Sequence, residues 1–104
     1  MDDDLYSRFL PQFLKSARGR LAVAMSAANG RDHAATQTVV RELHTLAGEA
    51  GLLGLSAVVP LARECEQKAK TLHISRADAD AEGLVAALRN LEQIIEGIGA
   101  TNTS

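Results

Sequence analysis

The stretch Glu42–Leu55, ELHTLAGEAGLLGL, decides the fold, because its apolar residues recur at the spacing of a helix that packs on one side. With 3.6 residues per turn, these residues and the apolar residues before them form one stripe, made of Ala35, Val39, Leu43, Leu46, Ala50 and Leu53. His44 lies roughly 130° from the centre of that stripe, at the boundary between core and water. The pattern therefore predicts an amphipathic helix with an accessible imidazole.

Two glycines, Gly48 and Gly51, lie beside His44 on the same face of this helix. Each is disfavoured inside a helix by about 1 kcal/mol relative to alanine, so the pair needs a physical reason. Close approach of another molecule to the histidine is one explanation. Tight packing of a neighbouring helix, with His44 an ordinary boundary residue, is the other, and the spacing alone leaves both open.

The composition favours one all-helical domain over residues 1–104. A chain of 104 residues, 46% of them hydrophobic, can bury about 65% of its unfolded surface and fold unaided. Alanine and leucine are abundant and tryptophan is absent, which favours helices over sheets. The single cysteine, Cys65, excludes an internal disulfide, and its place on an apolar stripe predicts a core residue rather than a reactive thiol.

Charge and hydropathy limit the partners of the chain. A formal net charge of -2 and the lack of a long basic cluster argue against general nucleic-acid binding. No run of about 18 apolar residues and no signal peptide occur, so we expect no membrane association and a cytoplasmic location. The expected partner is another protein, and the chain itself is expected to be a monomer.

Amphipathic segments with short connections predict an antiparallel four-helix bundle. Before Asn29 and Gly30, the sequence leaves two arrangements open. Either one helix is kinked at Pro11, or a short extra N-terminal helix ends at about Leu10 and a longer helix starts at Pro11. The helix with His44 is expected to run from an N-cap at Asp32 to about Leu53, and a third helix is expected to be capped by Ser56 with Pro60 in its first turn. A loop at His73–Ala77 should lead to a last helix over Asp80–Gly97. Residues from about 100 to 104 are expected to form a disordered tail.

The turn at Gly54 makes a hairpin of the two central helices, so residues about equally far from it are expected at similar height. The helix rise places His44, Arg63 and Glu66 each about 14 to 18 Å from this turn. A carboxylate that accepts the Nδ1 proton of His44 would fix the tautomer and leave Nε2 as the nucleophile. The alternative for Glu66 is a solvated residue in weak pairs with Arg63 and Lys70.

Other chemistries lack their sequence patterns. There are no Glu-x-x-His pairs of a di-iron bundle, no phosphate-cradling loop, and no serine or cysteine with an evident His/Asp companion set. His33 is expected to be structural and His73 solvated. We therefore expect no metal site and no autonomous catalysis.

The segment HTLAGEAGLLG, residues 44–54, resembles the signature of histidine-containing phosphotransfer (HPt) domains. That signature is His-x-Leu-Lys-Gly, four variable residues, an aliphatic residue and glycine. The matching residues are His44, Leu46, Gly48, Leu53 and Gly54. The resemblance extends loosely from about Leu5 to Leu91 and implies a four-helix bundle with one exposed histidine. The usual lysine three residues after the histidine is Ala47 here.

The resemblance implies a two-component phosphorelay carrier in which His44 accepts and donates a phosphoryl group. Glu66 would orient the imidazole, and Arg41 or Arg63 would stabilise the phosphoryl charge in place of the missing lysine. The implied partners are a response-regulator receiver domain, a histidine kinase, or both, and Mg²⁺ is expected on the partner, with no cofactor here. The expected docking residues are Val40, Ala47, Gly48, Gly51 and Val59.

Ala47 also motivates an alternative. An HPt-like bundle without that lysine would dock a receiver or kinase as a scaffold or inhibitor and would not be phosphorylated. In a third arrangement, these residues would form the phosphoacceptor domain of a larger histidine kinase.

Overall fold

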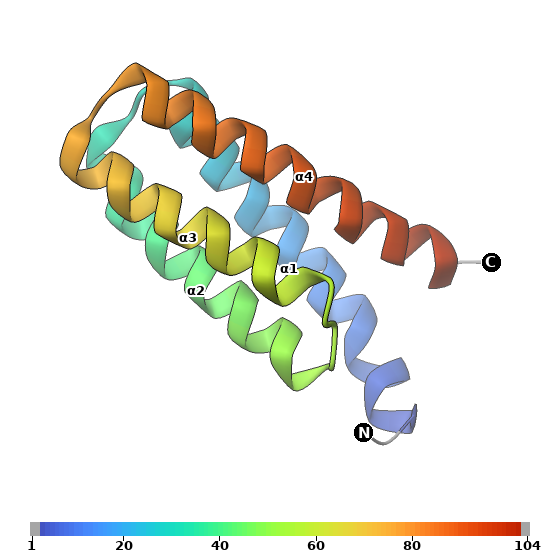
Figure 1. The fold of residues 1–104 in the computed structure, drawn as a ribbon. Helices are drawn as coiled ribbons and strands as arrows, with labels where there is room; N and C mark the ends of the chain where they lie inside the picture. The colour runs from blue at the N-terminus through green and yellow to red at the C-terminus, as the bar shows by residue number, and fades with distance from the viewer. Residues whose placement is uncertain (1–2, 103–104) are drawn as a thin grey trace.

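Four helices pack side by side in an up-down order, which confirms the predicted all-α four-helix bundle (Figure 1). The structure is a computed structural model that describes the backbone of residues 3–102 and the side chains of residues 6–101. Helix α1 contacts α2, α2 contacts α3, α3 contacts α4, and α4 closes the ring against α1. The elements are α1 (Asp3–Asn29), a 3-10 turn η1 (His33–Ala35), α2 (Thr36–Leu52), α3 (Val58–Ser75) and α4 (Asp78–Asn102).

Helix α1 continues through Pro11, so the short extra N-terminal helix does not form. A proline inside a helix costs about 3 kcal/mol, because it removes a backbone hydrogen bond and crowds the preceding turn. Leu10, Phe13 and Leu14 are buried on either side of the proline. Burial of each such side chain contributes about 1.5 to 3 kcal/mol, so the core contacts outweigh the local cost.

The ends of α2 differ from those predicted. The Asp32 carboxylate accepts a hydrogen bond from the Ala35 backbone N–H at 3.3 Å, so it caps the 3-10 turn that leads into α2 rather than α2 itself. Helix α2 ends at Leu52, and Gly54 makes the turn with a φ of 70°, a left-handed conformation that suits glycine.

Ser56 does not cap α3, because the cap position is Ala57, which forms no side-chain cap bond. The carbonyl of Leu55 instead accepts from the backbone N–H groups of Val58 and Val59, at 3.0 and 3.3 Å. Two of the free donors at the start of α3 are thereby satisfied by the backbone. Pro60 lies in the first turn of α3, as predicted.

The loop predicted at His73–Ala77 is too long, because α3 continues to Ser75. Arg76 takes a left-handed conformation with a φ of 54°, and its N–H donates to the Leu72 carbonyl at 2.8 Å, which closes the helix. The Ser75 hydroxyl accepts from the Ala77 N–H at 3.2 Å and donates to Asp80 at 2.5 Å. A polar stretch thus joins α3 to α4 directly.

The prediction that the last helix ends at Gly97 is also wrong, as is disorder at residues 100–102. Helix α4 runs to Asn102, while residues 103–104 lie outside the described residues. The end of α4 packs on α1: Gly99 is buried, a Cβ there would meet the Arg18 guanidinium at 2.7 Å, and Arg18 pairs with Glu96 at 2.8 Å. These tertiary contacts offset the low helix propensity of the two glycines.

The predicted apolar stripes form the core. Its fully buried members are Ala17, Ala24 and Ala28 of α1, Val39, Leu43, Leu46 and Ala50 of α2, Val58, Ala62, Cys65, Ala69 and Leu72 of α3, and Ala81, Leu84, Leu88, Leu91 and Ile95 of α4. Burial raises the pKa of the Cys65 thiol to about 12, so it is a core residue and not a reactive thiolate. Over the described part of the chain, no helix has a segment apolar and long enough to span a membrane.

Candidate functional site

His44 lies in the middle of α2 and points out of the bundle. Its side chain is 78% exposed, whereas its neighbours Leu43 and Leu46 are fully buried. Burial of those two leucines fixes the rotation of α2 about its axis and therefore holds the imidazole on the outside.

Glu66 of α3 reaches His44 across the hairpin. Its Oε2 lies 3.1 Å from Nδ1 of the imidazole, although the Glu66 side chain is only 10% exposed. An ionised carboxylate only accepts hydrogen bonds, so this contact assigns the proton to Nδ1 and leaves the Nε2 lone pair free. Among the described residues, none forms a hydrogen bond with Nε2. The structure thus brings together His44 and Glu66, which were expected at similar distances from the turn at Gly54.

The same oxygen of Glu66 has a second partner. Lys70, one turn further along α3, places Nζ 3.4 Å from Oε2, and its side chain is 49% exposed. A buried carboxylate costs free energy unless it is paired, and here it has two partners. The sequence-based alternative for Glu66 is therefore right about Lys70, but the residue is buried rather than solvated.

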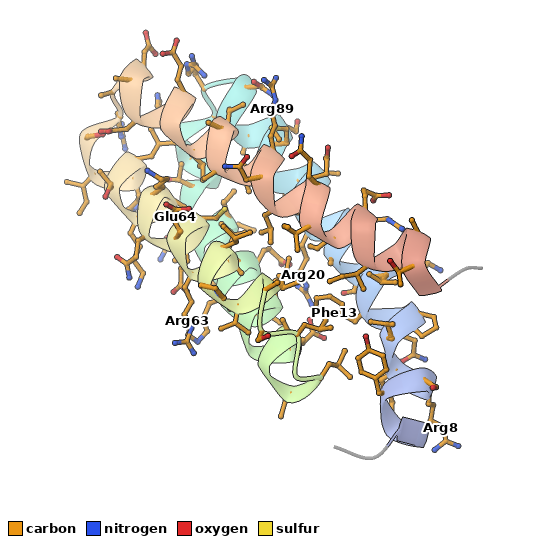
Figure 2. The ribbon with its side chains drawn as sticks, turned by 45° about the vertical axis from the view of Figure 1, so that its right-hand side comes forward. Arg8, Phe13, Arg20, Arg63, Glu64 and Arg89 are labelled. Carbon is orange, nitrogen blue, oxygen red and sulfur yellow. The ribbon has the colours of Figure 1, made fainter. Side chains whose placement is uncertain are left out.

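Arg41 and Arg63 are both exposed, and neither side chain forms an ion pair or hydrogen bond with another described residue. Figure 2 shows Arg63 directed away from the bundle. Side chains on a helix lean toward its N-terminus, so Arg41 and His44 lean in the same direction along α2 and the lean does not bring them together. The structure joins neither arginine to the imidazole or to Glu66.

The two glycines beside His44 are exposed, and a Cβ added at either would meet no heavy atom within 4 Å. Tight packing of a neighbouring helix therefore does not explain Gly48 and Gly51. Val40 and Val59 are half-buried at the edge of the same face. Ala47, which was also expected to be a docking residue, differs from the other four because it is only 4% exposed and offers a partner very little surface.

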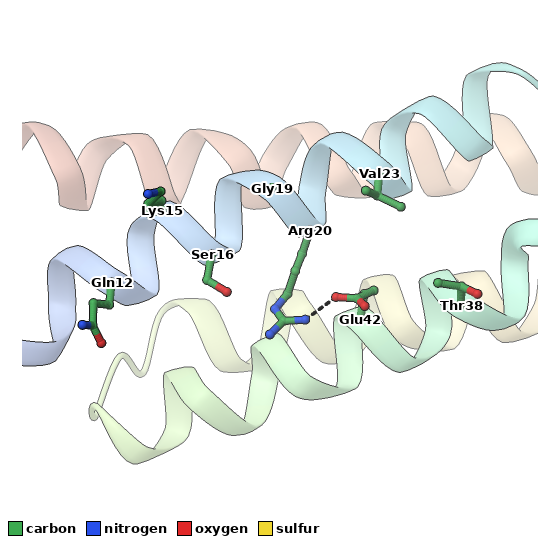
Figure 3. Close-up of a pocket in the computed structure, with 8 residues that line it drawn as sticks. All are labelled: Gln12, Lys15, Ser16, Gly19, Arg20, Val23, Thr38 and Glu42. Atoms are coloured by element: carbon green, nitrogen blue, oxygen red, sulfur yellow. Dashed lines mark hydrogen bonds and ion pairs between the residues drawn. The ribbon is translucent and has the colours of Figure 1, made fainter.

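A second polar cluster, which sequence reasoning missed, joins α1 to α2 (Figure 3). The Arg20 guanidinium forms an ion pair with Glu42 and lies 3.4 Å from Glu49. The available signal was an arginine between the apolar residues Ala17 and Leu21, together with two glutamates, Glu42 and Glu49, spaced to share one side of a helix. Arg20 and Glu42 line a groove together with Gln12, Lys15, Ser16, Gly19, Val23 and Thr38. The cluster braces the helix that carries His44.

His73 is exposed, as expected, but its ring is also bound to the start of α2. Its Nδ1 lies 2.6 Å from the hydroxyl of Thr36, which is itself buried and donates to the His33 carbonyl at 2.7 Å. A hydroxyl has a single proton to donate, so Nδ1 of His73 is the donor in the second contact. Within the described residues, no group of three His, Cys, Asp or Glu side chains is arranged to hold a metal ion.

Comparison with known proteins identifies the family. A family model described as Hpt domain matches residues 8–98. No curated protein matches the chain, and no solved structure does. Because the family match covers most of the chain and includes both His44 and Glu66, the chain belongs to the Hpt domain family, whose members are phosphocarrier modules of two-component phosphorelays that interact with receiver domains and histidine kinases.

Proposed function

We propose that this chain carries a phosphoryl group on Nε2 of His44 and exchanges it with a receiver-domain aspartate or a kinase domain. The single observation that carries the proposal is the 3.1 Å contact between Nδ1 of His44 and Glu66, on an imidazole that is 78% exposed. The contact orients a neutral ring with its nucleophilic nitrogen toward solvent.

In the transfer step, the Nε2 lone pair of His44 attacks the phosphorus of the partner's aspartyl phosphate. The N–P bond forms while the bond from phosphorus to the aspartate oxygen breaks, and its electron pair stays on the aspartate carboxylate. The Nδ1 proton remains on the ring, which becomes positively charged and donates a stronger hydrogen bond to Glu66. The reverse step returns the group to an aspartate.

The partner supplies the rest of the chemistry. Phosphoryl transfer depends mainly on positioning and on neutralising the charge of the moving group, which is the role of Mg²⁺ in receiver and kinase domains. This chain contributes the nucleophile and a surface to dock against, so it acts as a carrier without autonomous catalysis. We place it in the cytoplasm, where such partners obtain their phosphate.

The docking surface would surround His44. Gly48 and Gly51 carry no side chains and leave open space on the flank toward the Gly54 turn, so a partner's backbone can approach the imidazole closely there. Val40 and Val59 add partly exposed apolar area at its edge.

A second candidate function is a docking module that binds a receiver or kinase without being phosphorylated. It is favoured by Ala47, which places no cation where the family's signature has a lysine and which is almost completely buried. A carrier and a docking module bind the same partners, but only a carrier becomes covalently labelled.

One assay separates the two candidates. The chain is incubated with a phosphorylated receiver domain or an active kinase domain, and the label is tested for the stability of phosphohistidine, which is lost in acid and survives base. The label should disappear in His44→Gln and persist in the control His73→Gln, which changes the exposed histidine bound to Thr36. Label that survives His44→Gln, or a wild type that no donor labels, would overturn the carrier.

A further inference from the structure

We propose that Lys70 is the cation that stabilises the phosphorylated His44, in place of the lysine that the family's signature has at the position of Ala47. This assignment rests on the proposed carrier function, because it concerns the charge that arises only when His44 is phosphorylated. It replaces Arg41 and Arg63 as the source of that charge.

The first argument is a shared oxygen. Oε2 of Glu66 lies 3.1 Å from Nδ1 of His44 and 3.4 Å from Nζ of Lys70, so Nζ and Nδ1 are at most about 6.5 Å apart. An ammonium group has three N–H donors, and the ion pair with Glu66 occupies at most one of them. The other donors remain for phosphoryl oxygens.

The second argument is the direction of the side chains. Helices α2 and α3 are antiparallel (Figure 1), and the pairing of His44 with Glu66 places Lys70 level with Val40, one turn before His44. Helical side chains lean toward the N-terminus of their own helix, so Lys70 leans toward Glu66 while His44 leans toward Val40. The two side chains therefore converge.

The third argument is that the other nearby cations are engaged elsewhere or lack a link to the site. Arg20 is held by Glu42 and Glu49 on the side of α2 that faces α1. Lys68 lies on α3 too, but it is two positions before Lys70 in the sequence, which turns it by about 200° around the helix axis. Lys70 is half exposed, so its flexible stem is free to follow the phosphoryl group.

The size of the effect follows from the charge balance. A neutral imidazole becomes a positively charged ring bearing a phosphoryl group with two negative charges, so the site gains one net negative charge. A cation about 7 Å away, at an effective dielectric constant of about 40 to 80, favours that state about three- to sevenfold. Salt should reduce the effect, because these groups are exposed.

The test uses the whole chain and phosphoramidate, a small P–N donor that transfers its phosphoryl group to histidine with loss of ammonia. The pKa of the phosphoryl group on His44 is then followed by ³¹P NMR in wild type, Lys70→Gln, Lys70→Arg and Lys68→Gln. Lys70→Gln should raise the pKa of the phosphoryl group, with a proton affinity about three- to sevenfold higher. Lys70→Arg should restore the wild-type titration, and Lys68→Gln, which removes the same charge from α3, should match wild type.

The outcomes distinguish the two proposals. If phosphoramidate and a phosphorylated receiver both leave wild type unlabelled at His44, the carrier function and the role of Lys70 fall together. If wild type is labelled and Lys70→Gln titrates like wild type, the role of Lys70 is wrong and the carrier function stands. An equal rise in Lys68→Gln would overturn it as well, because the effect would then be one of net charge rather than position.

Discussion

Glu66→Gln is expected to slow phosphoryl transfer to His44 while the bundle stays folded. The substitution keeps the shape of the side chain and an acceptor oxygen near Nδ1, but it removes the negative charge that faces both the imidazole and Lys70. The positively charged ring that forms with the N–P bond would then donate to a neutral amide instead of a carboxylate.

The magnitude follows from the kind of hydrogen bond. Bonds to charged groups contribute about 1.5 to 3 kcal/mol and neutral ones about 0.5 to 1.5 kcal/mol, so the variant loses about 1 to 1.5 kcal/mol of stabilisation. Because 1.4 kcal/mol corresponds to a factor of ten, transfer should slow about five- to tenfold. The free energy of unfolding should change by less than about 1 kcal/mol, since removing a buried charge offsets the loss of its ion pair.

The assay measures the rate at which a phosphorylated receiver loses its label to the chain, with urea denaturation of the same variants alongside. Glu64→Gln is the matched control, because Glu64 lies on α3 but is exposed (Figure 2). Nitrogen NMR should show the proton of His44 on Nδ1 in wild type. An unchanged transfer rate in Glu66→Gln, or a proton on Nε2 in wild type, would refute the orienting role of Glu66.

The remaining predictions concern stability. Gly48→Ala should raise the free energy of unfolding by about 0.5 to 1 kcal/mol, because the site is helical and open, yet it should slow phosphoryl transfer from a receiver. The control Gly19→Ala changes an exposed glycine of α1 and should stabilise the fold without slowing transfer. Equal transfer rates in the two variants would show that Gly48 is not part of the docking surface. Arg20→Met should lower the free energy of unfolding by about 1 kcal/mol in urea denaturation, since its ion pairs with α2 are partly exposed, and a more stable variant would contradict the bracing role. The Cys65 thiol keeps its proton in the fold up to a pKa of about 12, whereas the unfolded chain ionises near 9.0. Stability should therefore be unaffected by this group below pH 9 and fall by about 1.4 kcal/mol per pH unit above it, and an equal slope in Cys65→Ala would show that the thiol is not the cause.

The interior of each helix was predictable because burial follows the period of the sequence. Leu43 and Leu46 lie on one face of α2 in any helix of 3.6 residues per turn, so the outward position of His44 is a consequence of two buried leucines. The contact between His44 and Glu66 was predictable for a similar reason. A tight turn and a fixed rise per residue determine which residues of a helical hairpin lie at the same height.

The helix ends were less predictable, because they depend on contacts with distant parts of the chain. Gly97 and Gly99 predicted the end of the last helix, yet Gly99 packs against Arg18 of α1 and α4 continues to Asn102. Ser56 is a favourable capping residue, but the Leu55 carbonyl satisfies the first donors of α3 instead. Local preferences of about 1 kcal/mol are easily overridden by such packing.

The direction in which side chains lean along α3, rather than their position around it, decides which charged residue reaches the site. Arg63 and Lys70 are each one turn from Glu66, on opposite sides along the helix, yet only Lys70 contacts the carboxylate. The contact of Lys70 with Glu66 also supplies a cation near a site where Ala47 is buried. A lysine at position 47 would approach from the flank of the Gly54 turn, where the glycines leave room for a partner, whereas Lys70 approaches from the opposite flank. Under both proposals, the cation and the docked receiver therefore do not compete for the same space beside His44, and Ala47→Lys should crowd the partner more than it helps the phosphoryl group.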